Sequence, residues 1–195
     1  TCDIHVHASQ ASFQGIGQNI ESGQWNTWFD RYAFPDESRF NDIAYAEQAY
    51  TRFAKSLLAT PTTRLCAYAT TSRTATETLM KALAKFGFAG YVGKVNMDRN
   101  CAAGLLETTE ETIAQTRLWL EETKDGIGAI YPILTPRYFP SCTESCLEQL
   151  GKLAEEYHVP VQSHLSEGLD EIDWVHELAP DLDYYAQAYD RAGLL

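Results

Sequence analysis

The chain has 195 residues and is 45% hydrophobic, which is enough to bury one core and excludes a disordered or collagen-like protein. Its formal net charge of −12 at pH 7 argues against nucleic acid and anionic membrane surfaces as partners, because both would repel it. A small neutral or cationic ligand suits this charge better.

Cysteine usage and the amino-terminal residues indicate the compartment. Five scattered cysteines, an odd number, indicate free thiols rather than a disulfide framework. No stretch of about 18 apolar residues predicts a membrane span, and the first residues lack the basic flank and apolar core of a signal peptide. We therefore expect a cytoplasmic protein with no membrane partner.

The first half of the chain alternates β-type and helical runs. A strand is predicted at "DIHVH" (3–7), and the polar, aromatic-rich residues 13–40 are predicted to form a long loop with short helical turns. Apolar residues recur at helical spacing over 41–57, and "TTRLCAYAT" (62–70) has the composition of a strand. A second helix is expected over 72–86.

The second half continues this alternation. In chain order we expect a strand at 89–97, a helix over 108–124, a strand at 129–136, a helix from 141, a strand at 159–166 and a last helix from 169. The expected helix N-caps are Ser72 and the capping boxes of Thr108 with Glu111 and Ser141 with Glu144.

Five β/α units in succession, without a hairpin signal, indicate an α/β protein with a parallel sheet. Two architectures fit this order, a doubly wound open sheet and an incomplete (β/α) barrel. A whole eight-stranded barrel takes ~250 residues, so a barrel would stop here after about five strands.

His5 and His7 are the first candidate site residues. They are two residues apart in a predicted strand, so their side chains share one face and can aim at one point. Two such imidazoles hold a zinc ion well, with Zn–N bonds of ~2.1 Å. For an isolated His-x-His, two core histidines bonded to backbone carbonyls are an equally good interpretation.

His164 favours the metal interpretation, because it ends another predicted parallel strand, where barrel enzymes collect catalytic groups. Glu167 follows at the start of the next helix. It would act as a general acid/base beside a metal, or simply complement the helix dipole. Three histidines leave one coordination position open, which is typical of a catalytic zinc site.

Arg137 and Gln10 are candidates for substrate binding. A guanidinium is rarely buried unpaired, so we expect Arg137, after the fourth predicted strand, to offer its donor fork to a substrate carbonyl or carboxylate. Gln10, three residues after His7, brings a donor and an acceptor to the same rim. A solvated loop position is the simpler alternative for each.

The segments "DIHVHASQ", "YAFPDESRF", "VGKVNMDRN", "ILTPRYFP", "QSHLSE" and "YDRAGLL" together resemble the guanine deaminases of the amidohydrolase superfamily, in order over essentially the whole chain. His-x-His marks only the superfamily, whereas "HASQ" with "TPR" is more specific. The resemblance implies a metal-dependent hydrolase with a TIM (β/α)8 barrel. It also implies one zinc ion and hydrolytic deamination of guanine to xanthine and ammonia in purine catabolism.

Carried over residue by residue, the resemblance makes His5, His7 and His164 the zinc ligands and Glu167 the proton shuttle. The residues that it places against the purine substrate are His7, Ala8, Ser9, Gln10, Arg137, Tyr138, His164 and Glu167.

The sequence also departs from this family. Members have a β-sandwich segment before strand one, a histidine after strand six, and an aspartate after strand eight that binds zinc and takes the water proton. We find no counterpart here, so we expect residues 1–195 to be one partial barrel domain of about strands one to five, inactive or weakly active alone. Unpaired strand edges would invite association, and we expect a homo-oligomer.

Two other functions remain open. The first is another amidohydrolase activity on a related ring, such as that of a chlorohydrolase or of a triazine or pterin deaminase. The second is a metal-free half-barrel with a binding or scaffolding role. Substitution of Arg137 and Gln10 tests the first, and metal analysis tests the second.

Overall fold

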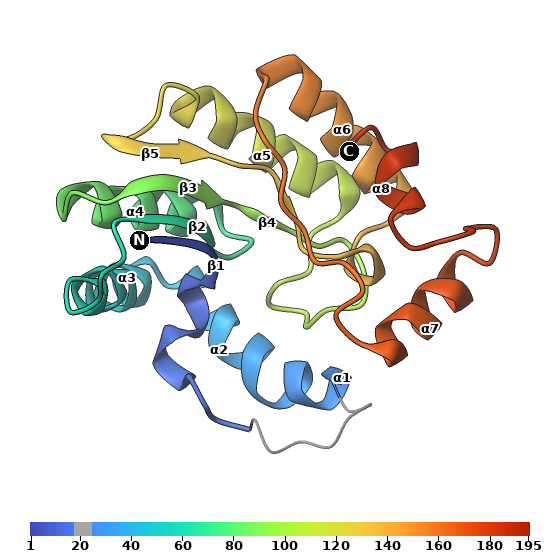
Figure 1. The fold of residues 1–195 in the computed structure, drawn as a ribbon, viewed down its shortest axis with the longest axis horizontal. Coiled ribbons are helices and arrows are strands. Elements are labelled where there is room, and N and C mark those ends of the chain that lie inside the picture. Colours follow the sequence, from blue (N-terminus) through green and yellow to red (C-terminus); the bar gives the residue numbers. More distant parts are fainter. Residues whose placement is uncertain (18–24) are drawn as a thin grey trace.

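The computed structural model describes residues 1–17 and 25–195, and its main sheet is parallel and lies on the left in Figure 1. Its four strands have the order β1-β2-β3-β5, and each neighbouring pair is parallel. β4 and β6 pair in a second, two-stranded parallel sheet. The strands are β1 (Cys2–His7), β2 (Arg64–Tyr68), β3 (Ala89–Gly93), β4 (Val95–Asn96), β5 (Ala129–Pro132) and β6 (Thr135–Pro136). The α/β fold expected from the sequence is confirmed.

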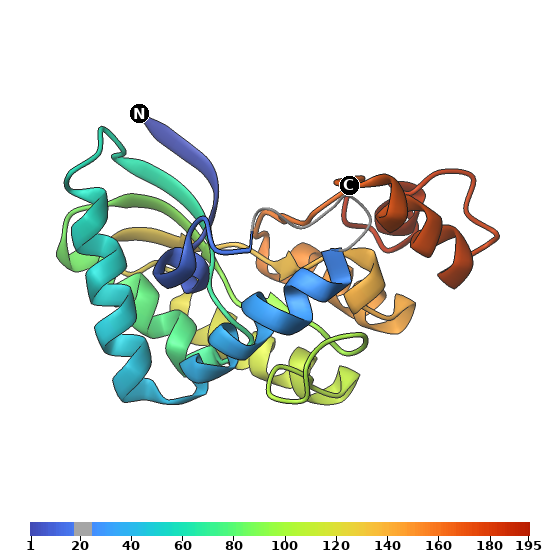
Figure 2. The same cartoon turned by 90° about the horizontal axis from the view of Figure 1, so that it is seen from below.

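Helices connect the strands, and α3, α4 and α5 lie side by side on one face of the main sheet (Figure 2). The helical elements are η1 (Ala8–Phe13), α1 (Trp25–Trp28), η2 (Phe29–Ala33), α2 (Phe34–Ser38), η3 (Arg39–Asn41), α3 (Ile43–Leu57), α4 (Arg73–Lys85), α5 (Thr109–Thr123), η4 (Phe139–Ser141), α6 (Glu144–Tyr157), α7 (Leu169–Leu178) and α8 (Gln187–Arg191). Within the described residues, no helix is long and apolar enough to cross a membrane.

The apolar faces of these helices form the core against the sheet. Tyr50 of α3, Leu79 and Leu83 of α4, and Trp119 of α5 are all buried in one cluster with Leu65 of β2. Full burial of each such side chain stabilises the fold by ~1.5–3 kcal/mol before the entropy cost. This packing holds the carboxyl ends of the strands in fixed positions.

The strand predicted over 89–97 divides into β3 and β4, and the strand predicted over 129–136 divides into β5 and β6. The surroundings of Gly93 show the physical reason. A Cβ atom on Gly93 would lie 1.7 Å from Thr135 Oγ1 and 2.7 Å from the carbonyl oxygen of Ile133. The absence of a side chain lets the two segments approach closely where β3 gives way to β4.

The prediction of a strand over 159–166 is wrong, because this segment forms no extended strand in the structure. One isolated bridge joins Val161 to Leu134, with hydrogen bonds from Leu134 N–H to Pro160 O and from Gln162 N–H to Leu134 O, both 2.9 Å. Pro160 has no amide hydrogen to extend the ladder. The segment still runs beside β6 and carries His164 to the strand ends.

Two of the three predicted N-caps are confirmed. Ser72 accepts from Ala75 N–H, and Thr108 forms both bonds of its capping box. The prediction of Ser141 as an N-cap is wrong, because its hydroxyl donates to a backbone carbonyl and Thr143 caps α6 instead. Residues 25–41, predicted as loop with short turns, form a continuous series of helical turns.

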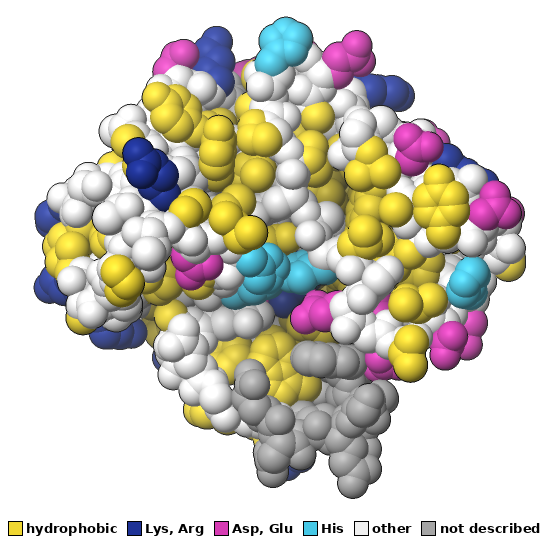
Figure 3. All heavy atoms as spheres, viewed as in Figure 1, with side chains coloured by type: hydrophobic (Ala, Val, Ile, Leu, Met, Phe, Trp, Pro, Cys, Tyr) yellow, Lys and Arg dark blue, Asp and Glu magenta, His cyan; other side chains and the backbone are white. Residues whose placement is uncertain are grey.

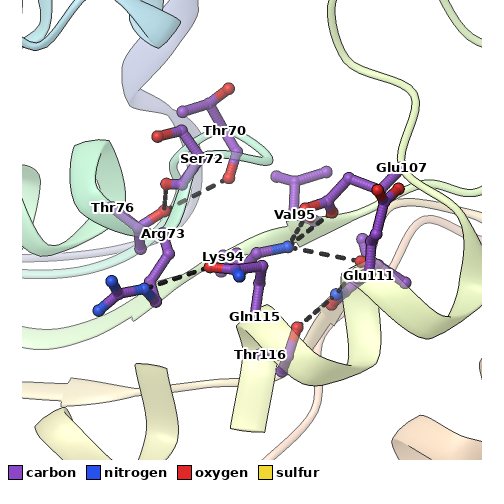
Figure 4. A network of polar contacts seen from close by, with 12 residues as sticks. Thr70, Ser72, Arg73, Thr76, Lys94, Val95, Glu107, Glu111, Gln115 and Thr116 are labelled. Carbon is purple, nitrogen blue, oxygen red and sulfur yellow. Dashed lines mark hydrogen bonds and ion pairs between the residues drawn. The ribbon is translucent and has the colours of Figure 1, made fainter. Parts of the chain in front are cut away.

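A buried polar cluster around Lys94 joins β3 and β4 to α5 (Figure 4). The Lys94 ammonium is 0% exposed and donates to Glu107 Oε2 (2.8 Å), Thr112 Oγ1 (3.4 Å) and Val95 O (3.5 Å). Each of its three N–H groups therefore has an acceptor. Burial lowers the pKa of Lys94, whereas the charge of Glu107 acts in the opposite direction. We call these four residues the Lys94 cluster.

Candidate active site

Three imidazoles meet at the carboxyl end of β1. His5 and His7 come from this strand, and His164 comes from the segment beside β6. One ring nitrogen from each of the three histidines lies within 4.8 Å of the corresponding nitrogens of the other two. Figure 3 shows histidine side chains gathered in a recess near the middle of this face, with hydrophobic side chains around it.

The donor chemistry of this cluster fits a metal ion of the zinc type. His164 Nδ1 lies 2.6 Å from the carbonyl oxygen of Arg137, so Nδ1 carries the hydrogen and Nε2 keeps its lone pair. This Nε2 lies only 3.0 Å from His7 Nε2. Two nitrogens aimed at one point, with His5 beside them, are the arrangement that a shared cation would stabilise.

The electrostatic surroundings keep two of these imidazoles neutral. Burial lowers the pKa of His7 well below its ordinary value, and the positive charge of Arg137 lowers it further. Burial also lowers the pKa of His164 to about 4, against an opposing contribution from its bond to the Arg137 carbonyl. Both rings are therefore in the form that binds metal at neutral pH.

Tyr68, at the end of β2, packs beneath all three imidazoles. Its ring centroid lies 4.5 Å from that of His7 in a stacked arrangement, 4.7 Å from His164 and 5.1 Å from His5. The phenol is buried, and its hydroxyl has no hydrogen-bond partner among the described residues. Sequence analysis missed this residue, because it carries no motif and is one strand away from the histidines.

Arg137 already has a carboxylate partner within the chain, which the sequence did not predict. The guanidinium is 2% exposed and paired with Glu37 of α2, with Nη1 to Oε2 at 2.7 Å and Nη2 to Oε1 at 3.2 Å. Burial alone lowers the pKa of Arg137, but the charge and hydrogen bonds of Glu37 raise it above its ordinary value. The partner is 100 residues away in the chain, so no local pattern could reveal it.

Gln10 reaches the same carboxylate, donating from Nε2 to Glu37 Oε1 at 2.9 Å. Two phenylalanine rings face the guanidinium of Arg137, at 5.2 Å for Phe29 and 5.4 Å for Phe34. The solvated loop alternative therefore fails for both Gln10 and Arg137. We call Gln10, Glu37 and Arg137 the Glu37 triad.

A model of the amidohydrolase family matches residues 2–195. The chain belongs to the amidohydrolase family. Guanine deaminases from Dictyostelium discoideum and Homo sapiens are each 38% identical, over 99% of this chain and 42% of their own length. A crystal structure of guanine deaminase from C. acetobutylicum with bound guanine in the active site has a TM-score of 0.94 and 41% identity, covering 98% of this chain and 45% of that one. The chain thus spans about two fifths of the length of the curated relatives it matches.

The remaining predicted residues of this amidohydrolase lie around the histidines. Ala8 and Ser9 are buried in η1, directly after His7, and the Ser9 hydroxyl lacks a partner in the described part of the chain. Tyr138 is 7% exposed, with its ring 6.2 Å from Phe29.

Glu167 lies just before α7 and does not belong to the group of three histidines that could hold a metal ion. Its side chain is exposed, and its backbone N–H donates to Glu171 Oε2 at 2.7 Å. Partial loss of hydration and the negative charge of Glu171 raise the pKa of Glu167, whereas His5 opposes this. A raised pKa favours the protonated form that a proton shuttle uses.

Proposed function

We propose that this chain forms the histidine-bearing part of a zinc-dependent aminohydrolase that converts guanine and water to xanthine and ammonia. One observation carries the proposal, namely that three imidazoles meet beside the Glu37 triad. The similarity to guanine deaminases over nearly the whole chain favours guanine among related rings.

In this proposal His5, His7 and His164 hold the zinc ion, and Tyr68 supports their rings from below. When bound, zinc supplies Lewis-acid chemistry that makes water a nucleophile at neutral pH. Arg137 and Gln10 hold the purine edge, and Tyr138 lies beside its plane. The aromatic side chains exclude water from the base.

Glu167 moves protons in the proposed reaction. It delivers a proton to the ring nitrogen next to C2 while the water oxygen bonds to that carbon. Glu167 then takes up one proton of the water and passes it to the amino group, so that the C2–N bond breaks and ammonia leaves. The second water proton leaves the C2 hydroxyl as the C2 carbonyl forms, and it returns Glu167 to its protonated state. The sum is one water consumed, one ammonia released and the 2-oxo product formed.

A graft tests this function in a complete barrel. Residues 1–195 replace the matching segment of the C. acetobutylicum guanine deaminase, and the conversion of guanine is followed by absorbance. We expect turnover that His164→Ala abolishes, whereas the isolated chain should show little or none.

A grafted barrel that binds zinc but does not deaminate guanine would contradict the proposal. Turnover of a triazine or pterin ring instead would favour another amidohydrolase activity. A chain that takes up no zinc on reconstitution would favour the metal-free scaffolding role.

A further inference from the structure

Glu37 connects the two residues that the proposed function assigns to the purine edge. Its carboxylate is 1% exposed, and both oxygens are occupied. Oε2 accepts from Arg137 Nη1, and Oε1 accepts from both Arg137 Nη2 and Gln10 Nε2. A carboxylate placed here thus controls two neighbouring side chains at once.

This contact fixes the orientation of the Gln10 amide. An ionised carboxylate only accepts hydrogen bonds, so the NH₂ group of Gln10 must face Glu37. The amide oxygen of Gln10 is then directed away from the carboxylate. Gln10 therefore offers an acceptor, with at most one spare N–H, to any ligand in the recess.

The same contact fixes what Arg137 offers. A guanidinium has five N–H donors, and the paired edge uses one on each Nη atom, which leaves three. Phe29 and Phe34 face the guanidinium and restrict its rotation. Arg137 therefore offers donors only, in a fixed plane.

We propose that Glu37 is a positioning residue that sets the polarity of base recognition, holding Gln10 as an acceptor and Arg137 as a donor. This inference rests on the proposed function and deepens it. The pair complements a ring that carries a carbonyl oxygen beside a ring N–H. Guanine has both groups, and 2-aminopurine has neither, because it lacks the carbonyl and the adjacent ring hydrogen.

The test compares the binding of these two bases to the zinc-loaded 195-residue chain. We expect the wild type to prefer guanine. In Glu37→Gln the Gln10 amide is free to turn and Arg137 loses its charged partner. Guanine affinity should fall by roughly 5- to 150-fold, the range for loss of one good bidentate contact. Affinity for 2-aminopurine, followed by its fluorescence, should change by less than about twofold.

Two further variants control for folding and charge. Glu37→Asp keeps the carboxylate and should restore part of the preference for guanine. Glu107→Gln removes the partner of another buried cation, and should lower thermal stability without changing the ratio of the two affinities. Equal weakening of both bases by Glu37→Gln would overturn the inference and leave the proposed function intact.

A ligand-free measurement keeps the two hypotheses separate. In the wild type, the side-chain amide protons of Gln10, assigned by NMR with Gln10→Met, should exchange slowly with solvent because one donates to Glu37. Rapid exchange of both protons would overturn the inference whatever binds. Wild-type chain that binds neither base would instead count against the proposed function, and the amide protons would still decide the role of Glu37.

Discussion

Two buried cations in this molecule differ in what they leave unused. Lys94 and Arg137 are both almost fully buried, and each faces a carboxylate, which lies 13 residues away in the chain for Lys94 and 100 residues away for Arg137. The three N–H groups of Lys94 are all taken up within its cluster, whereas Arg137 keeps three donors beyond its pair with Glu37. Burial of a charge thus does not by itself mark a functional site. What distinguishes Arg137 is its spare hydrogen-bonding capacity next to the three histidines.

The largest expected effect breaks the structural pair. Glu107→Gln leaves the Lys94 ammonium buried without its counter-ion, and loss of one partner of such a pair costs ~3–5 kcal/mol. Chemical denaturation should show this loss in the free energy of unfolding. Zinc binding should persist under native conditions, because the Lys94 cluster does not contact the imidazoles. In Lys94→Met/Glu107→Gln, much of the stability should return; a double variant as unstable as the single one would contradict this account.

The next effect concerns the metal. His164→Ala removes one of three ligands, and zinc affinity should fall by at least about 100-fold, the upper range for loss of a supporting residue alone. Competition with a chromophoric chelator measures this. His176→Ala is the matched control, because His176 is exposed in α7 and lies outside the cluster. Equal zinc affinity in the two variants would remove His164 from the site.

The pH dependence of the free energy of unfolding in the metal-free chain further distinguishes the histidine site from the Lys94 cluster. The pKa of His164 is about 4 in the folded chain, and that of His7 is also lowered. Below the unfolded value of about 6.5 the unfolded chain binds protons that the native chain does not. The free energy of unfolding should therefore fall as the pH drops from 6.5 toward 4, by up to ~1.4 kcal/mol per unit for each group. In His7→Gln/His164→Gln this slope should largely disappear.

The smallest effect is expected from removal of the Tyr68 hydroxyl. Its hydroxyl has no partner in the described structure, so Tyr68→Phe should change the free energy of unfolding by less than ~1 kcal/mol and leave zinc affinity unchanged. Tyr68→Ala removes the ring beneath the imidazoles and should cost ~3–5 kcal/mol and weaken zinc binding. A large loss in Tyr68→Phe would mean that the hydroxyl itself has a partner in the functioning site.

Local sequence patterns predicted most of the fold, because they report forces that act over a few residues. The apolar spacing of α3 and the capping box of Thr108 are such patterns, and both appear in the structure. The strand prediction over 159–166 failed. Its apolar composition suits a strand, but Pro160 lacks an amide hydrogen and the segment forms a single bridge. Short helical turns were predicted after Trp25, but their continuity over 25–41 was not, because aromatic and polar residues there show no clean period.

The three histidines of the site were predicted from their places on predicted strands, whereas residues that join them through the fold and carry no motif were missed. His5 and His7 could be paired from their spacing alone. Glu37 and Tyr68 could not, because their contacts with Arg137 and His7 span 100 and about 60 residues of chain. A buried arginine near a predicted site is nevertheless a signal to search for a distant carboxylate.

Zinc K-edge X-ray absorption on the reconstituted chain tests the central claim most directly. Three imidazoles that share one ion should give three nitrogen neighbours at ~2.0–2.1 Å with the outer-shell scattering of histidine rings. A zinc shell with one imidazole or none, or zinc that washes away from the wild type as readily as from His164→Ala, would contradict it.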